Sequence, residues 1–123
     1  MQALAIAVGG AVGSLLRFWL SSGVYALAGR GFPWGTMAVN LLGSFLIGFL
    51  SVFMLERVSV GPEVRAGITI GLLGGFTTFS TFSMETINLI EQGDLLKAML
   101  NIVVSVIACV AAAWIGLLLA RQI

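Results

Sequence analysis

The amino-acid sequence predicts an all-α membrane protein whose four transmembrane helices form a single domain over residues 1–123. Two features of the composition support this fold class: 59% of the 123 residues are hydrophobic, and only 9% are charged. The mean hydropathy of +1.12 lies outside the range of soluble globular domains. Because a helix of about 20 apolar residues crosses the hydrocarbon core of a bilayer, the chain is long enough for about four spans.

The four apolar stretches are separated by residues that favour turns. The expected spans cover residues 3–28, 33–55, 63–90 and 95–120. Gly29 and Gly31 end the first stretch, Gly61-Pro62 ends the second, and Gly93 follows the third. Pro33 suits the first turn of the second helix, because proline lacks only an amide hydrogen that has no partner at that position. Short connections place successive helices antiparallel to one another.

The third expected span contains a sequence that is unfavourable for an uninterrupted helix. Gly74-Gly75 is followed by five hydroxyl residues in the seven positions 77–83. We therefore expect a break near residues 74–78. Non-helical backbone at membrane depth occurs only where it is buried in protein or lines a cavity. Carbonyl groups that end the first half-helix would favour a cation, and amide groups that begin the second would favour an anion.

Polar residues within the other spans are candidates for function. Arg17 lies deep in the first span, where it must pair with another group or contact a permeating anion. Asn40 begins a stripe of four-residue spacing with Ser44 and Gly48, and its amide could bond a neighbouring helix or donate to an anion. Both interpretations remain open for each residue.

Two phenylalanines lie among the hydroxyl residues that follow the expected break. Phe79 and Phe82 are three positions apart and therefore share a helix face, with hydroxyl groups around them. The edge of an aromatic ring is electropositive, so ring edges in a narrow path could attract an anion. Simple packing is the alternative. The surrounding hydroxyl residues are Thr78, Ser80, Thr81 and Ser83, and a weaker polar stripe in the fourth span consists of Asn101, Ser105 and Cys109.

The distribution of basic residues indicates no preferred orientation in the membrane. With four spans, both termini lie on one side of the membrane. The termini side carries Arg57, Arg65 and Arg121, the other side carries Arg30 and Lys97, and Arg17 lies within a span. Since basic residues normally fix orientation, this balance favours insertion in both directions and an antiparallel homodimer. A single orientation set by other factors remains the alternative. Small residues at helical spacing, such as Gly9 with Gly13 and Gly67 with Gly71, predict close helix packing.

The composition also excludes several classes of function. The formal net charge is +1, which gives no basic surface for nucleic acid. There is no histidine, and no carboxylate falls in the middle of a span, so haem ligation and most hydrolytic chemistry lack their usual residues. We therefore do not expect an enzyme.

The motifs of this chain resemble those of the bacterial Fluc, or CrcB-type, fluoride channel family, over nearly the whole length. The resemblance rests on Gly13-x-x-x-Arg17, on Gly35-Thr36-Met37-Ala38-Val39-Asn40, and on Gly74-Gly75-Phe76-Thr77-Thr78-Phe79-Ser80-Thr81-Phe82. It implies a passive fluoride channel that exports cytoplasmic fluoride across the bacterial cytoplasmic (inner) membrane. It also implies a dual-topology antiparallel homodimer with two pores.

The same resemblance implies roles for individual residues. A structural sodium ion would be held at the dimer interface by the backbone carbonyls of Gly74 and Thr77. Fluoride would pass the ring edges of Phe79 and Phe82 and the amide of Asn40. The hydroxyl groups expected along this pore belong to Thr78, Ser80, Thr81 and Ser105, and Arg17 is expected to be a structural buried charge. The chain departs from the family at Asn101, where a tyrosine can occur, and at Cys109, where a hydroxyl residue can occur.

Two other classes of small membrane protein fit some of these features. Dual-topology proton-coupled multidrug exporters have the same size and number of spans, but they share a glutamate within the first span. The first span of this chain has no acidic residue. An anchor subunit of a respiratory complex would usually ligate haem through histidine, which is absent. The sequence therefore favours the channel.

Overall fold

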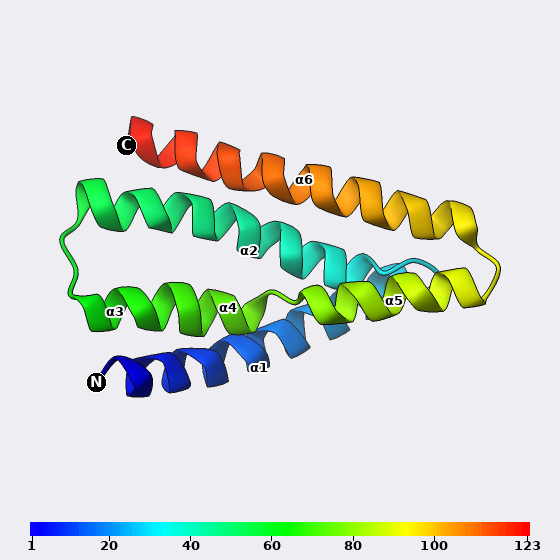
Figure 1. Cartoon of the computed structure of the whole chain (residues 1–123), viewed down its shortest axis with the longest axis horizontal. Helices are drawn as coiled ribbons and strands as arrows, with labels where there is room; N and C mark the ends of the chain where they lie inside the picture. Colours follow the sequence, from blue (N-terminus) through cyan, green and yellow to red (C-terminus); the bar gives the residue numbers. More distant parts are fainter.

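The computed structural model describes residues 1–123, and every regular element in it is helical, as the sequence predicts (Figure 1). The α-helices are α1 (Gln2–Ala28), α2 (Trp34–Val52), α3 (Pro62–Ala66), α4 (Leu73–Phe76), α5 (Phe79–Glu91) and α6 (Leu95–Gln122). Two π-helical stretches continue them: η1 (Phe53–Arg57) extends α2, and η2 (Gly67–Leu72) joins α3 to α4. Gly29 and Gly93 have φ angles of 82° and 83° in the turns that follow α1 and α5, a conformation that other residues rarely adopt.

Three helices are long and apolar enough to cross a membrane, namely Gln2–Ala28, Trp34–Arg57 and Leu95–Gln122. The chain is therefore a multi-pass membrane protein. The remaining expected span, residues 63–90, corresponds to α3, η2, α4 and α5 in succession. None of these elements alone is long enough to cross, because the helical backbone stops after Phe76 and resumes at Phe79.

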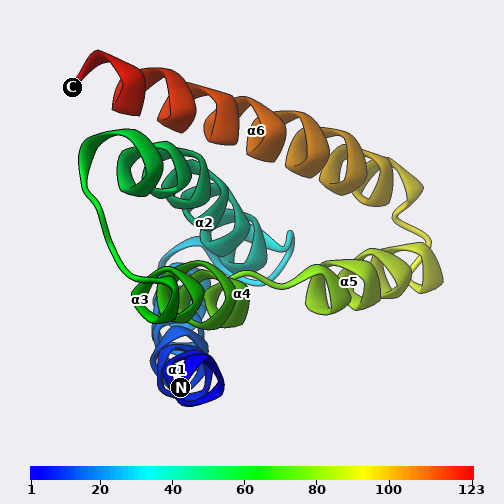
Figure 2. The same cartoon turned by 60° about the vertical axis from the view of Figure 1, so that its left-hand side comes forward.

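The helical segments lie side by side with both termini at the same end (Figure 1). α2 packs mainly against α6, and α1 packs against η2 and α4. The rotated view shows α5 extending away from α1 toward the beginning of α6 (Figure 2). The half-helix α5 thus has less of its surface covered by the rest of the chain than α4 has.

Glycines allow the close contact between α1 and the third helical segment. A Cβ atom built on Gly9 would collide with the carbonyl oxygen of Gly67, and one on Gly13 would collide with that of Leu72. On the other side, Gly48 of α2 meets the backbone of α6 in the same way. Helices in lipid associate through such backbone contact, so the stripes of small residues determine where these helices touch.

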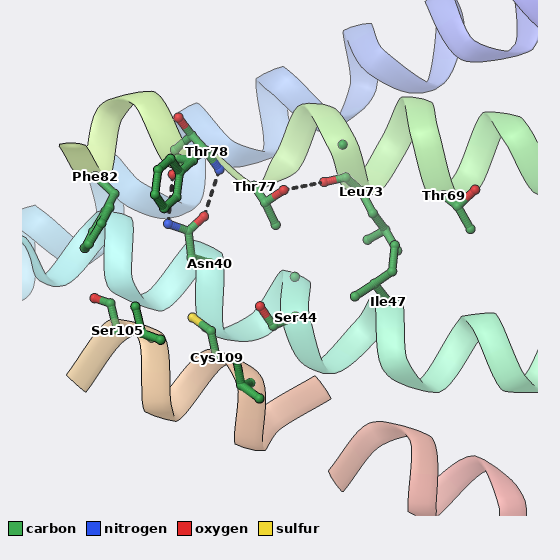
Figure 3. Close-up of a pocket in the computed structure, with 15 residues that line it drawn as sticks. Asn40, Ser44, Ile47, Thr69, Leu73, Thr77, Thr78, Phe82, Ser105 and Cys109 are labelled. Carbon is green, nitrogen blue, oxygen red and sulfur yellow. Dashed lines mark hydrogen bonds between the residues drawn. The ribbon is translucent and has the colours of Figure 1, made fainter. Parts of the chain in front are cut away.

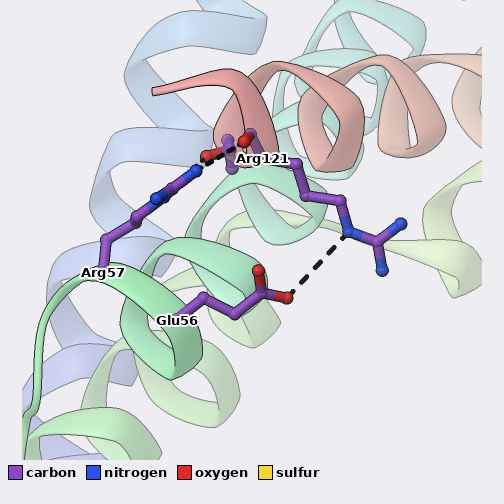
Figure 4. A network of polar contacts seen from close by, with 4 residues as sticks. Glu56, Arg57 and Arg121 are labelled. Atoms are coloured by element: carbon purple, nitrogen blue, oxygen red, sulfur yellow. Dashed lines mark hydrogen bonds and ion pairs between the residues drawn. The ribbon is translucent and has the colours of Figure 1, made fainter.

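Polar contacts at the termini end join α6 to η1 (Figure 4). Arg57 donates from Nε to the carbonyl oxygen of Ala120 at 3.4 Å and from Nη2 to that of Arg121. These carbonyls lie in the last turn of α6, where they lack helical donors and where a positive charge is favourable. The ion pair between Arg121 and Glu56, at 4.0 Å, is more than half exposed and adds little stability.

Candidate functional site

A cavity of about 400 Å³ lies where the interruption of the third segment faces α2 and α6 (Figure 3). Its apolar wall includes Phe79 and Phe82 of α5 and Leu73 of α4. Its polar and small lining residues are Asn40, Gly43 and Ser44 of α2, Thr69 of η2, Gly74, Thr77 and Thr78 of the third segment, and Ser105 and Cys109 of α6. Asn40, Phe79, Phe82, Thr78, Ser105, Gly74 and Thr77, all proposed from the sequence, therefore border one cavity.

The interruption consists of two residues with extended backbone. Thr77 has φ −86° and ψ 157°, and Thr78 has φ −150° and ψ 118°. The side chain of Asn40 bonds both polar groups of the Thr78 backbone: Nδ2 donates to the carbonyl oxygen at 2.9 Å, and the amide donates to Oδ1 at 2.8 Å. Asn40 thus replaces hydrogen bonds that Thr78 would make in a continuous helix. One hydrogen of its amide group remains beyond the one bonded to Thr78.

These contacts explain why two particular carbonyl groups lose their helical donors. In a continuous helix the Thr78 amide would donate to Gly74, and the Thr81 amide would donate to Thr77. Instead the Thr78 amide donates to Asn40, and the Thr81 amide donates to Oγ1 of Thr78 at 3.2 Å. The carbonyl oxygens of Gly74 and Thr77 are therefore free to accept from another group. Oxygen donors of this kind suit a hard cation.

The start of α5 offers donors of the opposite kind. Thr78 is its N-cap, and the capping bond satisfies the amide of Thr81. The amide groups of Phe79 and Ser80, in the first turn, have no partner within the helix. The helix dipole makes this end positive, so it favours an anion. The interruption thus places groups suited to a cation and groups suited to an anion within a few residues of each other.

The two phenylalanines differ strongly in exposure. Phe82 is 8% exposed and packs within the chain, whereas Phe79 is 75% exposed. Their ring centroids are 5.3 Å apart, with an angle of 40° between the ring planes. The two rings therefore present edges and faces at different angles to the same cavity, as expected for residues three positions apart on one helix face.

Ser80, Thr81 and Arg17 lie outside this cavity. Thr81 and Arg17 instead border a second cavity of about 220 Å³, which Thr78 also lines. Oγ of Ser80 lies 3.4 Å from Oγ1 of Thr78. Arg17 is half-buried and forms no ion pair within the chain. The structural role expected for Arg17 stays a prediction. The carboxylate of Glu85 accepts a hydrogen bond from Tyr25 at 2.6 Å.

The polar stripe of α6 divides into a buried part and a part that faces the cavity. Asn101 is 1% exposed and does not line the cavity. Ser105 lines it, but its hydroxyl group donates to Oδ1 of Asn101 at 3.2 Å. Cys109 is half-buried and lines the cavity, and its side chain forms no hydrogen bond with Asn101.

Ser44 lines the cavity, although the sequence predicts no separate role for it. The hydroxyl groups of Thr69 and Thr77 donate to backbone carbonyls four residues earlier in the chain, at 2.7 and 3.0 Å. Ser44 forms no such bond, and its side chain lies at the cavity beside Asn40 (Figure 3). The four-residue spacing from Asn40 was the signal that could have identified it.

Together these features define a multi-pass membrane protein in which an interrupted helix lines a partly polar cavity, an arrangement typical of proteins that transport ions. The cavity is bordered by an amide, hydroxyl groups, free backbone carbonyls and two aromatic rings. It contains no cluster of histidine, cysteine, aspartate or glutamate that could bind a metal through side chains.

The chain belongs to the family described as "CrcB-like protein, Camphor Resistance (CrcB)", which matches residues 4–117. This result confirms the resemblance found in the motifs. A protein of Geobacter sulfurreducens named "Fluoride-specific ion channel FluC" is 55% identical over 120 residues, which cover 98% of this chain and 97% of the relative. A protein of Magnetococcus marinus with the same name is 49% identical over the full length of both chains.

A third relative, from Methylococcus capsulatus, carries the same name and is 54% identical over 123 residues. The match covers all of this chain and 54% of that relative, so this chain spans about half the length of the Methylococcus protein. All three relatives are named as ion channels and not as enzymes.

Proposed function

We propose that this protein is a fluoride-selective channel through which fluoride leaves the cytoplasm passively. The observation that carries the proposal is the convergence of Asn40, the interruption at Thr77 and Thr78, and both phenylalanines on one cavity. The relatives named as fluoride-specific channels support the choice of ion.

Fluoride binds water tightly, so a selective path must replace its hydration without retaining the ion. The remaining amide hydrogen of Asn40 and the uncommitted hydroxyl group of Ser44 are donors on one face of α2. The ring edges of Phe79 and Phe82 add a weak positive potential that attracts the anion, and the apolar rings hold no water in the path. A few weak donors in succession suit rapid passage better than one strong site. In this proposal Thr78 and Ser105 supply further hydroxyl groups where the path crosses this cavity, and Ser80 and Thr81 supply them outside it.

The proposed transport is passive, because the residues that couple transport to protons are missing. A proton-coupled exporter, the alternative considered from the sequence, needs a carboxylate at membrane depth. α1 has no acidic residue, and Glu85 near the end of the third segment is bonded to Tyr25. Flow down the fluoride gradient requires no such group.

We further propose that the segment α3 to α5 makes the fourth membrane crossing, and that two copies assemble antiparallel with two pores. The exposure of Phe79, a large apolar ring that borders the cavity, supports a partner chain at this face. The nearly equal number of basic residues on the two sides supports insertion in both orientations. The proposed location is the bacterial cytoplasmic (inner) membrane.

A sodium ion at the centre of this dimer fits the residues present. The carbonyl oxygens of Gly74 and Thr77 would hold it, since both have lost their helical donors. The ion would offset the partial negative charge of these oxygens and strengthen the contact between the copies. Two hydrogen bonds keep these carbonyls free: the Thr78 amide donates to Asn40, and the Thr81 amide donates to the hydroxyl oxygen of Thr78.

The proposal is tested with purified protein in liposomes loaded with fluoride or with chloride, and a potassium ionophore prevents build-up of a membrane potential. An ion-selective electrode measures the anion that is released. Rapid release of fluoride with negligible release of chloride is the expected result. If neither anion is released and transport of an organic cation appears only with a proton gradient, the protein is the exporter and the proposal is wrong.

A further inference from the structure

Two hydrogen bonds connect the backbone of Phe82 to α6, and a third within α6 extends the chain of bonds. The hydroxyl group of Thr86 donates to the carbonyl oxygen of Phe82 at 2.8 Å, and Nδ2 of Asn101 donates to Oγ1 of Thr86 at 2.9 Å. Ser105 then donates to Oδ1 of Asn101 at 3.2 Å. The side chains of Thr86, Asn101 and Ser105 are 6%, 1% and 6% exposed, so water does not compete for these groups.

The contact between Asn101 and Thr86 is more specific than the other two bonds. A threonine in a membrane helix often bonds the carbonyl four residues earlier, so the bond from Thr86 to Phe82 needs no neighbouring helix. The hydroxyl oxygen of Thr86 has one hydrogen, which Phe82 uses, and a lone pair, which Asn101 uses. Asn101 thereby joins α5 to α6 at one defined position, and its Oδ1 atom accepts the hydrogen bond from Ser105.

α5 needs such a connection because the extended residues Thr77 and Thr78 separate it from α4. Phe79 is largely exposed and contributes little packing within the chain. Thr86 lies one turn beyond Phe82 on the same helix face, so a tie at Thr86 limits both the rotation of α5 and the place of the Phe82 ring.

We propose that Asn101 is a positioning residue that fixes the ring of Phe82 against the cavity by acting through Thr86. Its consequence for transport rests on the proposed channel function, in which this ring borders the path of the anion. Asn101 itself does not reach the cavity, so it affects the ion only through the orientation of α5.

The test uses three variants and one spectroscopic probe. Asn101→Leu and Thr86→Val keep the approximate size of each side chain and remove its hydrogen bond, and Thr86→Ser keeps the hydroxyl group. In each background Phe82 is replaced by 4-fluorophenylalanine, and its ¹⁹F resonance is recorded in detergent without added fluoride. Fluoride release is measured in liposomes with the unlabelled proteins. Circular dichroism and elution volume identify any variant that fails to fold.

A positioning role predicts a displaced or broadened resonance for Asn101→Leu and Thr86→Val and an unchanged one for Thr86→Ser. Fluoride release should fall about tenfold in the first two, as expected for the loss of one buried hydrogen bond, and the double variant should be no slower. The inference is overturned if the resonance is unchanged in Asn101→Leu, or if Thr86→Val and Thr86→Ser behave alike. The second comparison still holds if Asn101→Leu does not fold. A resonance that responds in a protein that releases no fluoride would refute the channel and leave the positioning role intact.

Discussion

Replacing Asn40 with leucine should change the path of the backbone through the cavity. Leucine has nearly the same size as asparagine but cannot bond Thr78, so both the 2.8 Å and the 2.9 Å hydrogen bonds are lost. Hydrogen bonds between membrane helices contribute about 0.6 kcal/mol on average and at most about 1.7 kcal/mol each, so the pair contributes about 1–3 kcal/mol. The freed amide of Thr78 can then return to the carbonyl oxygen of Gly74, which restores a continuous helix.

A shift of about 1–3 kcal/mol changes the equilibrium ratio of the interrupted to the continuous conformation by about 5-fold to 150-fold. Fluoride release from liposomes should fall by a similar factor in Asn40→Leu. Asn88→Leu is the matched control, because Asn88 is exposed on α5 and its change should alter release by no more than about twofold. Release from Asn40→Leu within twofold of the unmodified protein would refute the role of these two bonds.

Three further predictions concern the rest of the site and its packing. Isoleucine in place of Phe79 or Phe82 removes the ring edges and should slow fluoride release about tenfold while elution of the assembled protein stays unchanged, and unchanged release in both variants would exclude a role for the rings. Ser44→Ala should slow release more than Ser105→Ala, since only the hydroxyl of Ser105 is already bonded to Asn101; the reverse order would contradict this assignment. Gly13→Val should lower the midpoint of thermal unfolding in detergent by several degrees, because the added carbons meet the backbone of Leu72 and cost about 1–3 kcal/mol. An equal midpoint would show that α1 and η2 can separate without loss of stability.

Much of the helical organisation could be predicted from apolar stretches and turn residues. The three long helices Gln2–Ala28, Trp34–Arg57 and Leu95–Gln122 begin and end within one or two residues of three expected stretches, because Gly29, Gly61-Pro62 and Gly93 give strong local signals. The pair Gly74-Gly75 with the hydroxyl residues after it predicts an interruption, and non-helical backbone occurs at Thr77 and Thr78. These features depend on local sequence alone.

The assignment of side chains to the cavity could not be predicted as well. Helical periodicity loses its phase across two extended residues, so the face on which Ser80 and Thr81 lie cannot be derived from the position of Gly74. The π-helical stretches η1 and η2 shift the phase again, and their apolar sequences give no signal of it.

Burial of polar residues also depends on tertiary contacts that a single sequence does not contain. Asn101 and Cys109 belong to one stripe, yet Asn101 is covered by α5 and bonds Thr86, while Cys109 borders the cavity. The contact between Glu85 and Tyr25 of α1 could not be foreseen either, because the two residues are 60 positions apart in the sequence. Both cases require knowledge of which helices are neighbours.

The central claim, passive and selective conduction of fluoride, is tested most directly by the reversal potential of the protein in a planar bilayer. The two chambers contain equal chloride and a tenfold difference in fluoride, with no proton gradient. The proposed channel predicts a current that reverses near the fluoride equilibrium potential, about 59 mV from zero for a monovalent ion. A current that reverses near zero would show that fluoride is not selected. The absence of any current without a proton gradient would contradict passive conduction.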